Sequence, residues 1–234
     1  EAISNVKLMS RVDEKFVFNQ SKLPGIISES LPYYNIVTVN NKLIQEYNTY
    51  YFDTIDKTFF NHHHNNFYSR NKVRFREYVD SGIFFLEVKQ KNNKKVTTKK
   101  RIKVDSVPSD QLTYEQQAYI NSILGFTKPL ISQHSTIFNR ITFVHKVNLE
   151  RLTVDINLSY KDSINSGKFK NLVVAELKKN KAQSTSDFKK ILKRHRVRPL
   201  RFSKYCMSTI QLCDNIKYNR FKEKLLLINK IIKE

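Results

Sequence analysis

The stretch VRFREYV, residues 73–79, has the alternation of a β-strand that carries two arginines on one face. Val73 and Phe75 fall on one parity, whereas Arg74 and Arg76 fall on the other. Side chains of a strand point alternately to the two faces of a sheet, so the two guanidinium groups point the same way, about 7 Å apart. A single strand of this kind is consistent with a half-exposed strand whose arginines face water. If the pattern repeats along the chain, another explanation is required.

The other predicted strands repeat this pattern. Charged residues share one parity in further segments: Arg11, Asp13 and Lys15 in RVDEKF; Glu87, Lys89 and Lys91 in FFLEVKQK; Lys99, Arg101 and Lys103 in VTTKKRIKV; Arg140 in FNRITF; Arg151 and Asp155 in RLTVDINL; Glu176 and Lys178 in VVAELKK. An open sheet with one wet face usually alternates with Ser, Thr, Gln and mixed charges, whereas most charges here are basic.

Closing such a sheet into a barrel would place all of these side chains inside it. Burying so many like charges without partners is prohibitively costly, so the interior has to be wet and filled by a polyanion with metal ions. The apolar parity then faces outward and needs a cover of helices. The sequence therefore predicts an α+β fold, a closed antiparallel β-barrel with a polar, basic lumen and flanking helices.

Periodicity and turn signals divide the chain into elements. Strands are predicted at 9–18, 44–54, 72–79, 83–91, 95–104, 136–147, 150–159 and 171–179, and helices at 21–31, 112–124, 184–195 and from 203 to the end. Residues 57–71, which include three consecutive histidines at 62–64, are predicted to form an irregular connection. Since repeats and low-complexity linkers are absent from the sequence, one domain is expected over residues 1–234.

The net charge restricts the partners of the protein. The 234 residues carry a formal charge of +21, which implies a polyanion such as nucleic acid, anionic lipid or a phosphorylated metabolite. The basic segment 189–201 is compatible with a nucleic-acid patch, a solvated helix face or an electrostatic funnel at the mouth of a tunnel. The four glycines do not form a Walker A loop, and we find no catalytic triad signal.

Two cysteines bear on the cellular compartment. Cys206 and Cys213 are seven residues apart in a predicted helix, which puts them two turns apart and too far for a disulfide. They are expected to be reduced, as in cytosolic proteins. The sequence has neither a stretch as long as a membrane span nor a signal-peptide pattern. We therefore predict a cytoplasmic protein, and a location at the cytoplasmic face of a membrane is compatible with this prediction.

The order and spacing of these motifs resemble a VTC domain, the polyphosphate-polymerase branch of the triphosphate tunnel metalloenzymes (the CYTH-like superfamily). RVDEKF resembles a degenerate form of the first-strand Glu-x-Glu-x-Lys motif, with Lys15 at its basic end. VRFRE, LEVK, KKR, FNR, RLTVD and VVAELK follow in the family's order, and RFSKY at 201–205 resembles its Lys-x-Ser-Lys segment. Arg11 replaces the first glutamate, which argues against a two-metal hydrolytic site, and Phe138 stands where the family often has Tyr.

The resemblance implies a fold and a set of site residues. The family fold is an eight-stranded antiparallel tunnel with flanking helices. The residues expected to act in catalysis are Lys15, Arg74, Arg76, Lys89, Arg140, Arg151 and Lys204. Substrate binding is expected of Lys99, Arg101, Lys178, Arg201 and Ser203, and Mn²⁺ or Mg²⁺ binding of Glu176 with help from Glu87 or Asp155.

The resemblance also implies a reaction, the metal-dependent transfer of the γ-phosphate of ATP to a growing inorganic polyphosphate chain. ATP and polyphosphate are the expected partners, together with a membrane protein outside this chain, and no specific nucleic acid is expected. Two alternatives stay open at this point. The same tunnel could hydrolyse tripolyphosphate or a nucleotide triphosphate, or it could bind polyphosphate or nucleic acid without catalysis.

Overall fold

An antiparallel sheet organises the part of the chain that the computed structural model describes, residues 11–94, 96–109, 111–183 and 185–234. Its strands are β1 (Arg11–Asn19), β2 (Tyr34–Ile36), β3 (Ile44–Asp53), β4 (Arg70–Tyr78), β5 (Ile83–Lys91), β6 (Thr97–Val104), β7 (Ile131–His145), β8 (Glu150–Lys161), β9 (Ser166–Lys168) and β10 (Leu172–Asn180). Their order is β1-β10-β8-β7-β3-β4-β5-β6, with short β2 on β7 and β9 on β8. The antiparallel α+β fold expected from the sequence is thereby confirmed.

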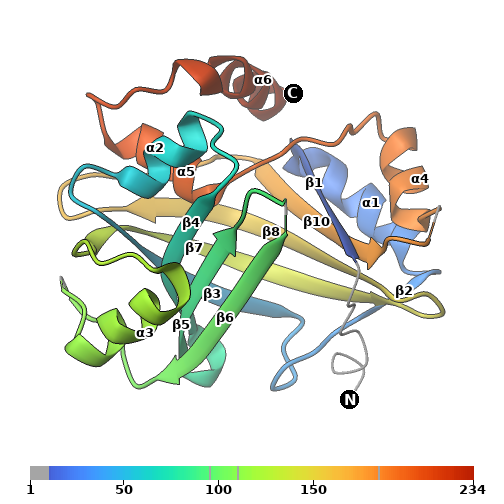
Figure 1. Cartoon of the computed structure of the whole chain (residues 1–234). Coiled ribbons are helices and arrows are strands. Elements are labelled where there is room, and N and C mark those ends of the chain that lie inside the picture. The colour runs from blue at the N-terminus through green and yellow to red at the C-terminus, as the bar shows by residue number, and fades with distance from the viewer. Residues whose placement is uncertain (1–10, 95, 110, 184) are drawn as a thin grey trace.

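Helices flank this sheet. They are α1 (Leu23–Ser30), α2 (Thr58–His64), α3 (Tyr114–Leu124), α4 (Asp187–Arg194), α5 (Lys204–Leu212) and α6 (Lys222–Lys233), with 3₁₀ turns at Gln20–Lys22, Val79–Ser81 and Asn219–Phe221. In Figure 1, α3 lies beside β5 and β6, α1 and α4 lie beside β1 and β10, and α6 lies across one end. Within the described ranges, none of these helices combines the length and the apolar character needed to cross a bilayer.

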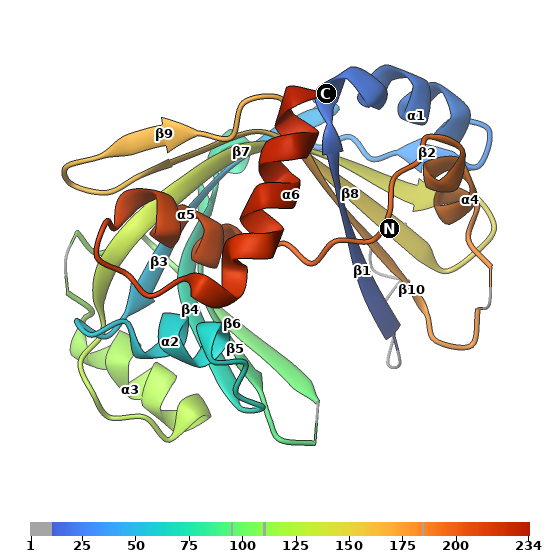
Figure 2. The ribbon, with the colours of Figure 1, turned by 90° about the horizontal axis from the view of Figure 1, so that it is seen from above.

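The sheet curls strongly (Figure 2) but does not close, so the predicted closed barrel is wrong. The two terminal strands of the order, β1 and β6, are not paired with each other. Residues 196–202, here called the strap, cover the free edge of β1 instead: Leu200 N donates to Lys15 O at 2.8 Å, and Pro199 bridges Phe16. Because Pro199 has no N–H, it cannot extend a ladder on that edge.

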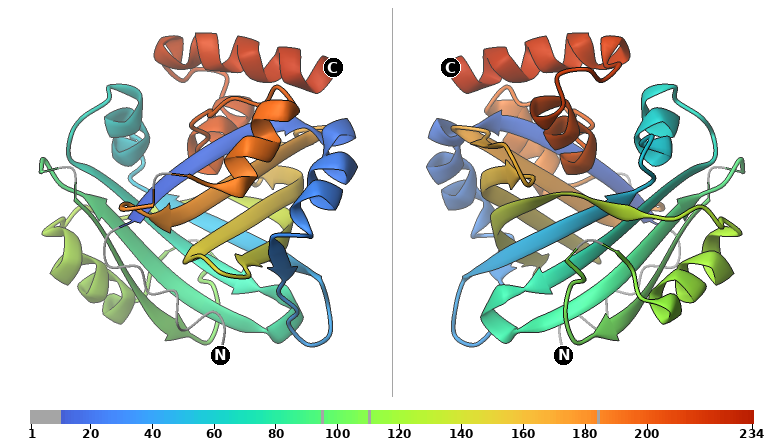
Figure 3. Two further views of the ribbon diagram at one scale, coloured as in Figure 1. Left: turned by 90° about the vertical axis from the view of Figure 1, so that its right-hand side faces the viewer. Right: turned by 90° about the vertical axis from the view of Figure 1, so that its left-hand side faces the viewer.

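The outer surface of the curl holds two apolar cores. Helices α1 and α4 lie beside β1 and β10 (Figure 3). Outward residues of these strands such as Phe16 and Val173 belong to the core formed there, in which the rings of Phe16 and Phe188 meet edge to face. On β4 and β5, Phe75 and Leu86 pack with α3. The helices therefore cover the apolar parity of the strands, as the alternation predicts.

A third core closes one end of the inner, concave face. Val17, Val174, Tyr51 and Phe138 have the parity of the charged residues, but they pack against α5 and α6. The concave face is therefore apolar at the end that α5 and α6 cover, and it is charged further along the strands.

Some elements differ from their expected form. The histidines at 62–64 end helix α2 instead of lying in an irregular connection, and buried His64 places Nε2 2.8 Å from Asn219 Oδ1. Helix α2 begins where Asp53 accepts hydrogen bonds from Phe59 N and Phe60 N, a contact made by the preceding strand. The C-terminal helical region is interrupted between α5 and α6. The predicted strand at 9–18 includes residues 9 and 10, which lie outside the described residues, as do residue 95 of a predicted strand and residue 184 of a predicted helix.

Candidate active site

The strand register brings the predicted charged residues onto the concave face. Lys15 is opposite Glu176, Asp155 is opposite Arg140, and Arg74 is opposite Glu87 in neighbouring strands. The same face carries Lys72 and Arg76 on β4, Lys89 on β5, Lys99, Arg101 and Lys103 on β6, Arg151 on β8 and Lys178 on β10. Some of these residues form three clusters around Asp155, Glu87 and Glu176.

The first cluster surrounds Asp155, whose residue is 3% exposed. Arg140 donates to it through two bonds, Nε to Oδ1 at 2.6 Å and Nη2 to Oδ2 at 2.8 Å, and Lys204 Nζ donates to Oδ2. Burial opposes ionisation of the Asp155 carboxyl, but the two cations hold its pKa well below the usual range. The same burial lowers the pKa of Lys204 to about 8. Asp155 is therefore a carboxylate that holds two cations in place.

Aromatic rings support these two cations. The guanidinium of Arg140 lies 5.0 Å from the Tyr47 ring centroid and 5.2 Å from that of Phe138, and Lys204 Nζ lies 4.2 Å from the Phe138 centroid. Such contacts stabilise a cation that has left bulk water. Phe138 therefore contributes a cation–π contact at the place where the family often has a hydroxyl donor.

The second cluster surrounds Glu87, which is 1% exposed. Arg74 Nε and Nη2 both lie 2.7 Å from Glu87 Oε2, and Lys99 Nζ donates to Oε1. Burial opposes ionisation of Glu87, but the charges of Arg74, Arg76 and Lys99 hold its pKa well below the usual range.

Arg76 differs from Arg74, although both point to the same face. Its residue is 7% exposed, and its Nε donates weakly to Thr49 Oγ1 at 3.4 Å. Its guanidinium lies over the rings of Tyr47 and Phe138, and no carboxylate of the described residues pairs with it. Burial, reinforced by Arg74, lowers the pKa of Arg76 to about 10, which leaves it charged at neutral pH. Arg76 is thus a buried cation whose charge no acid contacts directly.

The third cluster surrounds Glu176 on β10. Lys15 Nζ lies 2.7 Å from Oε2, Lys178 Nζ donates to Oε1, and Lys178 also reaches Asp13 at 3.1 Å. Burial opposes ionisation of Glu176, but the two lysines hold its pKa well below the usual range. Its side chain is 21% exposed, more than those of Glu87 and Asp155.

These acids do not form a ready cage for a metal ion. Across the described ranges, no three His, Cys, Asp or Glu side chains gather where one ion could touch them all. Mg²⁺ commonly binds one or two carboxylates and takes its remaining ligands from water and substrate phosphates. Glu176 fits that role best, because it is the most exposed of the three carboxylates and is held by lysines only.

Because the sheet curls, charged side chains from strands at opposite ends of the strand order come close enough to interact electrostatically. Burial lowers the pKa of Lys89 on β5, and the charges of Glu176 and Lys15, on β10 and β1, also act on its ammonium group. The exposed Arg101 of β6 lies 4.5 Å from the Phe85 ring centroid. The concave face therefore presents cations from both of its sides.

The apolar end carries a residue that the sequence reasoning missed. Lys72 Nζ lies 3.3 Å from Ser203 Oγ and 5.7 Å from the Tyr205 ring centroid, and burial lowers its pKa to about 7. Its parity matches that of Arg74, so alternation could have identified it. Ser203 also caps α5 by accepting from Cys206 N. Arg201 is exposed on the strap and makes no polar contact with the described residues of the clusters.

Two solved structures are similar to this chain. A putative adenylyl cyclase from Hippeastrum, described as having a dominant triphosphatase activity, is similar in structure with a TM-score of 0.53 and 10% identity, over 90% of this chain and all (100%) of that one. A putative adenylate cyclase from Vibrio parahaemolyticus gives a TM-score of 0.49 and 11% identity, over 86% of this chain and 99% of that one. At such identities the likeness concerns the fold alone.

No curated protein matches the sequence. The model of the VTC domain, in contrast, matches residues 10–213, which include all three acid clusters and helix α5. Because this match covers most of the sequence, the chain belongs to the VTC domain family.

Proposed function

We propose that the protein transfers the γ-phosphate of ATP to a growing inorganic polyphosphate chain on the concave face. The observation that supports this most directly is Arg76, a buried guanidinium that no acid of the described residues contacts. A group of this kind is costly to bury and becomes favourable when a phosphate oxygen reaches it.

Phosphoryl transfer depends on charge neutralisation and in-line positioning more than on covalent help from the protein. Arginine offers two parallel donors to phosphate oxygens, and lysine offers a compact charge. Arg74, Arg76 and Arg140 are expected to grip and align the phosphates. Lys15, Lys89, Lys99 and Lys204, with Arg151, are expected to neutralise the rest of the chain. The terminal phosphate of the acceptor is the nucleophile, so the protein has to supply none.

The acids of the three clusters hold six of the cations in place before substrate arrives: Lys15, Arg74, Lys99, Arg140, Lys178 and Lys204. A phosphate that enters can exchange with Glu176 as the partner of Lys15 and Lys178. Glu176 is then released to hold Mn²⁺ or Mg²⁺, with Glu87 and Asp155 as further oxygen donors. Such an ion, when bound, neutralises charge that develops on the transferring phosphate.

Hydrolysis of tripolyphosphate or a nucleotide triphosphate is the second candidate. A putative adenylyl cyclase described as having a dominant triphosphatase activity shares this fold, so a concave face of this kind is compatible with hydrolysis. Arg11, which stands in place of the first acid of the superfamily motif, argues against it. Fold does not fix activity, so the reaction products have to decide between the two.

The cellular location belongs to the same proposal. Both cysteines, Cys206 and Cys213, are free thiols, which supports a cytoplasmic protein. We propose ATP and polyphosphate as its partners.

The test is incubation with ATP and Mn²⁺, followed by a gel that separates polyphosphate from free phosphate. The wild type is expected to yield polymer. Glu176→Gln is expected to lose turnover while its melting temperature shows that it still folds, and Glu223→Gln, an exposed change on α6, serves as the matched control. Free phosphate without polymer would support hydrolysis, and binding without turnover would support a non-catalytic module. Full activity of Glu176→Gln at saturating Mn²⁺ would remove its metal role.

A further inference from the structure

A second basic site lies on the outer side of β1, separated by that strand from the concave face. Here a pocket of about 670 Å³ lies between α4, the strap and β1, and we call it the outer pocket. Phe16, Val197 and Pro199 line its apolar part, and Lys189, Lys190, Lys193, Arg196 and Arg198 supply its cations. Because Lys15 and Phe16 are consecutive in a strand, Lys15 faces the concave side and Phe16 faces the outer pocket.

The cations of the outer pocket are only partly neutralised. Lys189 pairs with Glu14 at 2.8 Å, and Lys190 pairs with Asp187 at 3.1 Å. Lys193, Arg196 and Arg198 are exposed, and none of them has an acid partner among the described residues. The pocket therefore carries a surplus of three positive charges.

Arg194 of α4, which does not line the outer pocket, is neutralised. Its Nε donates to Glu29 on α1 at 2.9 Å, and His195 Nε2 lies 2.8 Å from the other oxygen of Glu29. Arg196 adopts a φ of +57°, in the left-handed region that favours Gly or Asn after a helix. The chain thus keeps an arginine in a conformation that arginine disfavours, at the position where it lines the pocket.

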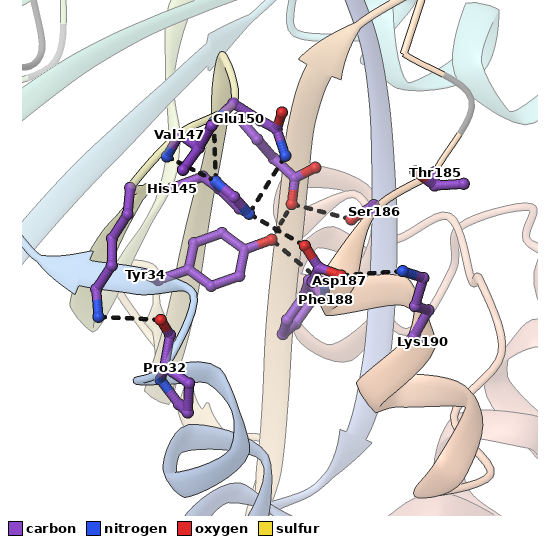
Figure 4. A network of polar contacts seen from close by, with 12 residues as sticks. Pro32, Tyr34, His145, Val147, Glu150, Thr185, Ser186, Asp187, Phe188 and Lys190 are labelled. Carbon is purple, nitrogen blue, oxygen red and sulfur yellow. Dashed lines mark hydrogen bonds and ion pairs between the residues drawn. The ribbon is translucent and has the colours of Figure 1, made fainter.

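The wall of the outer pocket is held in place from beneath (Figure 4). Ser186, which lines the pocket and caps α4, donates to the buried Glu150 at 2.9 Å, and Tyr34 Oη donates to the same oxygen. Tyr34 Oη also accepts from Phe188 N at 3.3 Å, and His145 Nε2 lies 3.2 Å from Asp187. Three strands thereby anchor the first turn of α4, so the pocket is formed before a ligand arrives.

We propose that the outer pocket binds an anion with several linked phosphate groups, the group shared by nucleoside triphosphates and short polyphosphates. Its volume lies in the range of about 300–1,000 Å³ that is usual for small-molecule sites. Arginine and lysine from α4 and the strap can hold successive phosphates, while the apolar part leaves room for a base or for the stems of the lysines. The proposal stands independently of the reaction on the concave face.

Calorimetric titration with tripolyphosphate, repeated with ATP, tests the proposal on four forms of the full chain. The outer-pocket variant is Lys193→Ser, Arg196→Asn, Arg198→Ser, in which Asn suits the positive φ. The concave-face variant is Lys15→Met, Arg76→Met. The control, Lys217→Ser, Lys230→Ser, Lys233→Ser, removes three exposed cations elsewhere. We expect two sites in the wild type and the control, and one site in each of the other two.

The outcomes separate this proposal from the proposed function. Two sites of unchanged affinity in the outer-pocket variant would overturn the outer site, as would a single wild-type site that only the concave-face variant loses. A single site that only the outer-pocket variant loses would keep the outer site and remove triphosphate binding from the concave face. ATP binding more tightly than tripolyphosphate at the outer site would identify a nucleotide as its ligand. Duplex DNA that needs these three cations and resists displacement by tripolyphosphate would also overturn the proposal.

Discussion

Asp155 on the concave face and Glu150 beneath α4 are carboxyl groups of the same strand with opposite charge behaviour. They are 3% and 0% exposed, so burial alone does not distinguish them. Asp155 receives its hydrogen bonds from Arg140 and Lys204, whereas Glu150 receives them from the neutral donors Tyr34, Ser186 and Gln183. The pKa of Asp155 is accordingly held well below its usual range, and burial raises that of Glu150 to about 7.

The different donors to Asp155 and Glu150 distinguish the two sides of the sheet. On the concave face, acids stay ionised and keep cations in position, so a phosphate can replace a carboxylate as their partner. Beneath α4, Glu150 joins β8 to β2 and to the start of the helix through the neutral donors Tyr34 and Ser186, and the contact of His145 with Asp187 adds β7. On the concave face a cation can therefore change its anionic partner. Beneath α4 the hydrogen bonds keep the start of the helix in one position.

The largest expected effect follows from removing a cation from the concave face. Arg140→Met leaves the Asp155 carboxylate buried with Lys204 as its remaining cation, and breaking such a buried pair costs about 3–5 kcal/mol. Urea unfolding should show a loss of that size. The double variant Arg140→Met, Asp155→Leu should recover much of it, because the buried carboxylate is gone. A single variant as stable as the wild type would show that Arg140 does not hold Asp155 in its charged state.

A smaller effect separates the two arginines of VRFREYV. Since Arg76 has no carboxylate partner among the described residues, Arg76→Met should leave the free energy of unfolding unchanged or higher. It should lower the affinity for tripolyphosphate by roughly 10- to 100-fold, the equivalent of a charge-assisted hydrogen bond of about 1.5–3 kcal/mol. Arg74→Met is the matched control and should destabilise the protein, because it leaves buried Glu87 with Lys99 alone. Equal losses of stability in the two variants would contradict this distinction.

The sequence predicted which side chains share a face, because strand alternation is a local property. Arg74, Arg140 and Asp155 lie on the concave parity as expected, and the apolar parity is covered by helices. The same parity includes Lys72, which lies directly before the VRFREYV stretch. The predicted single domain over 1–234 stays a prediction.

Closure of the sheet could not be read from alternation, because it depends on contacts between distant segments. The strap reaches the edge of β1 from 185 residues further along the chain, where Leu200 N donates to Lys15 O at 2.8 Å. The start of α2 likewise depends on Asp53, which accepts a hydrogen bond from Phe59 N. The buried Glu150 accepts a hydrogen bond from Tyr34, which is 116 residues away. None of these pairings has a local signature in the sequence.

The smallest expected effect is the pH response of the network beneath α4. The pKa of Glu150 is about 7 in the folded protein and is expected to return to its usual value near 4.5 on unfolding. The folded state therefore binds the extra proton between these two pKa values, and the stability that Glu150 contributes falls as pH rises through this window. For a chain of this size the change should appear as a shift of several degrees in Tm.

Glu150→Gln should remove this response, because an amide keeps a carbonyl acceptor for Tyr34 and Ser186 and does not titrate. The Tm of the wild type minus that of the variant should fall steadily from pH 4.5 to pH 8, so that the variant gains relative to the wild type at the basic end. Glu223→Gln, on the exposed side of α6, controls for the loss of one negative charge. A Tm difference that stays constant across this range, or that rises with pH, would mean that Glu150 is ionised in the folded protein, as Asp155 is, and the contrast between the two regions would disappear.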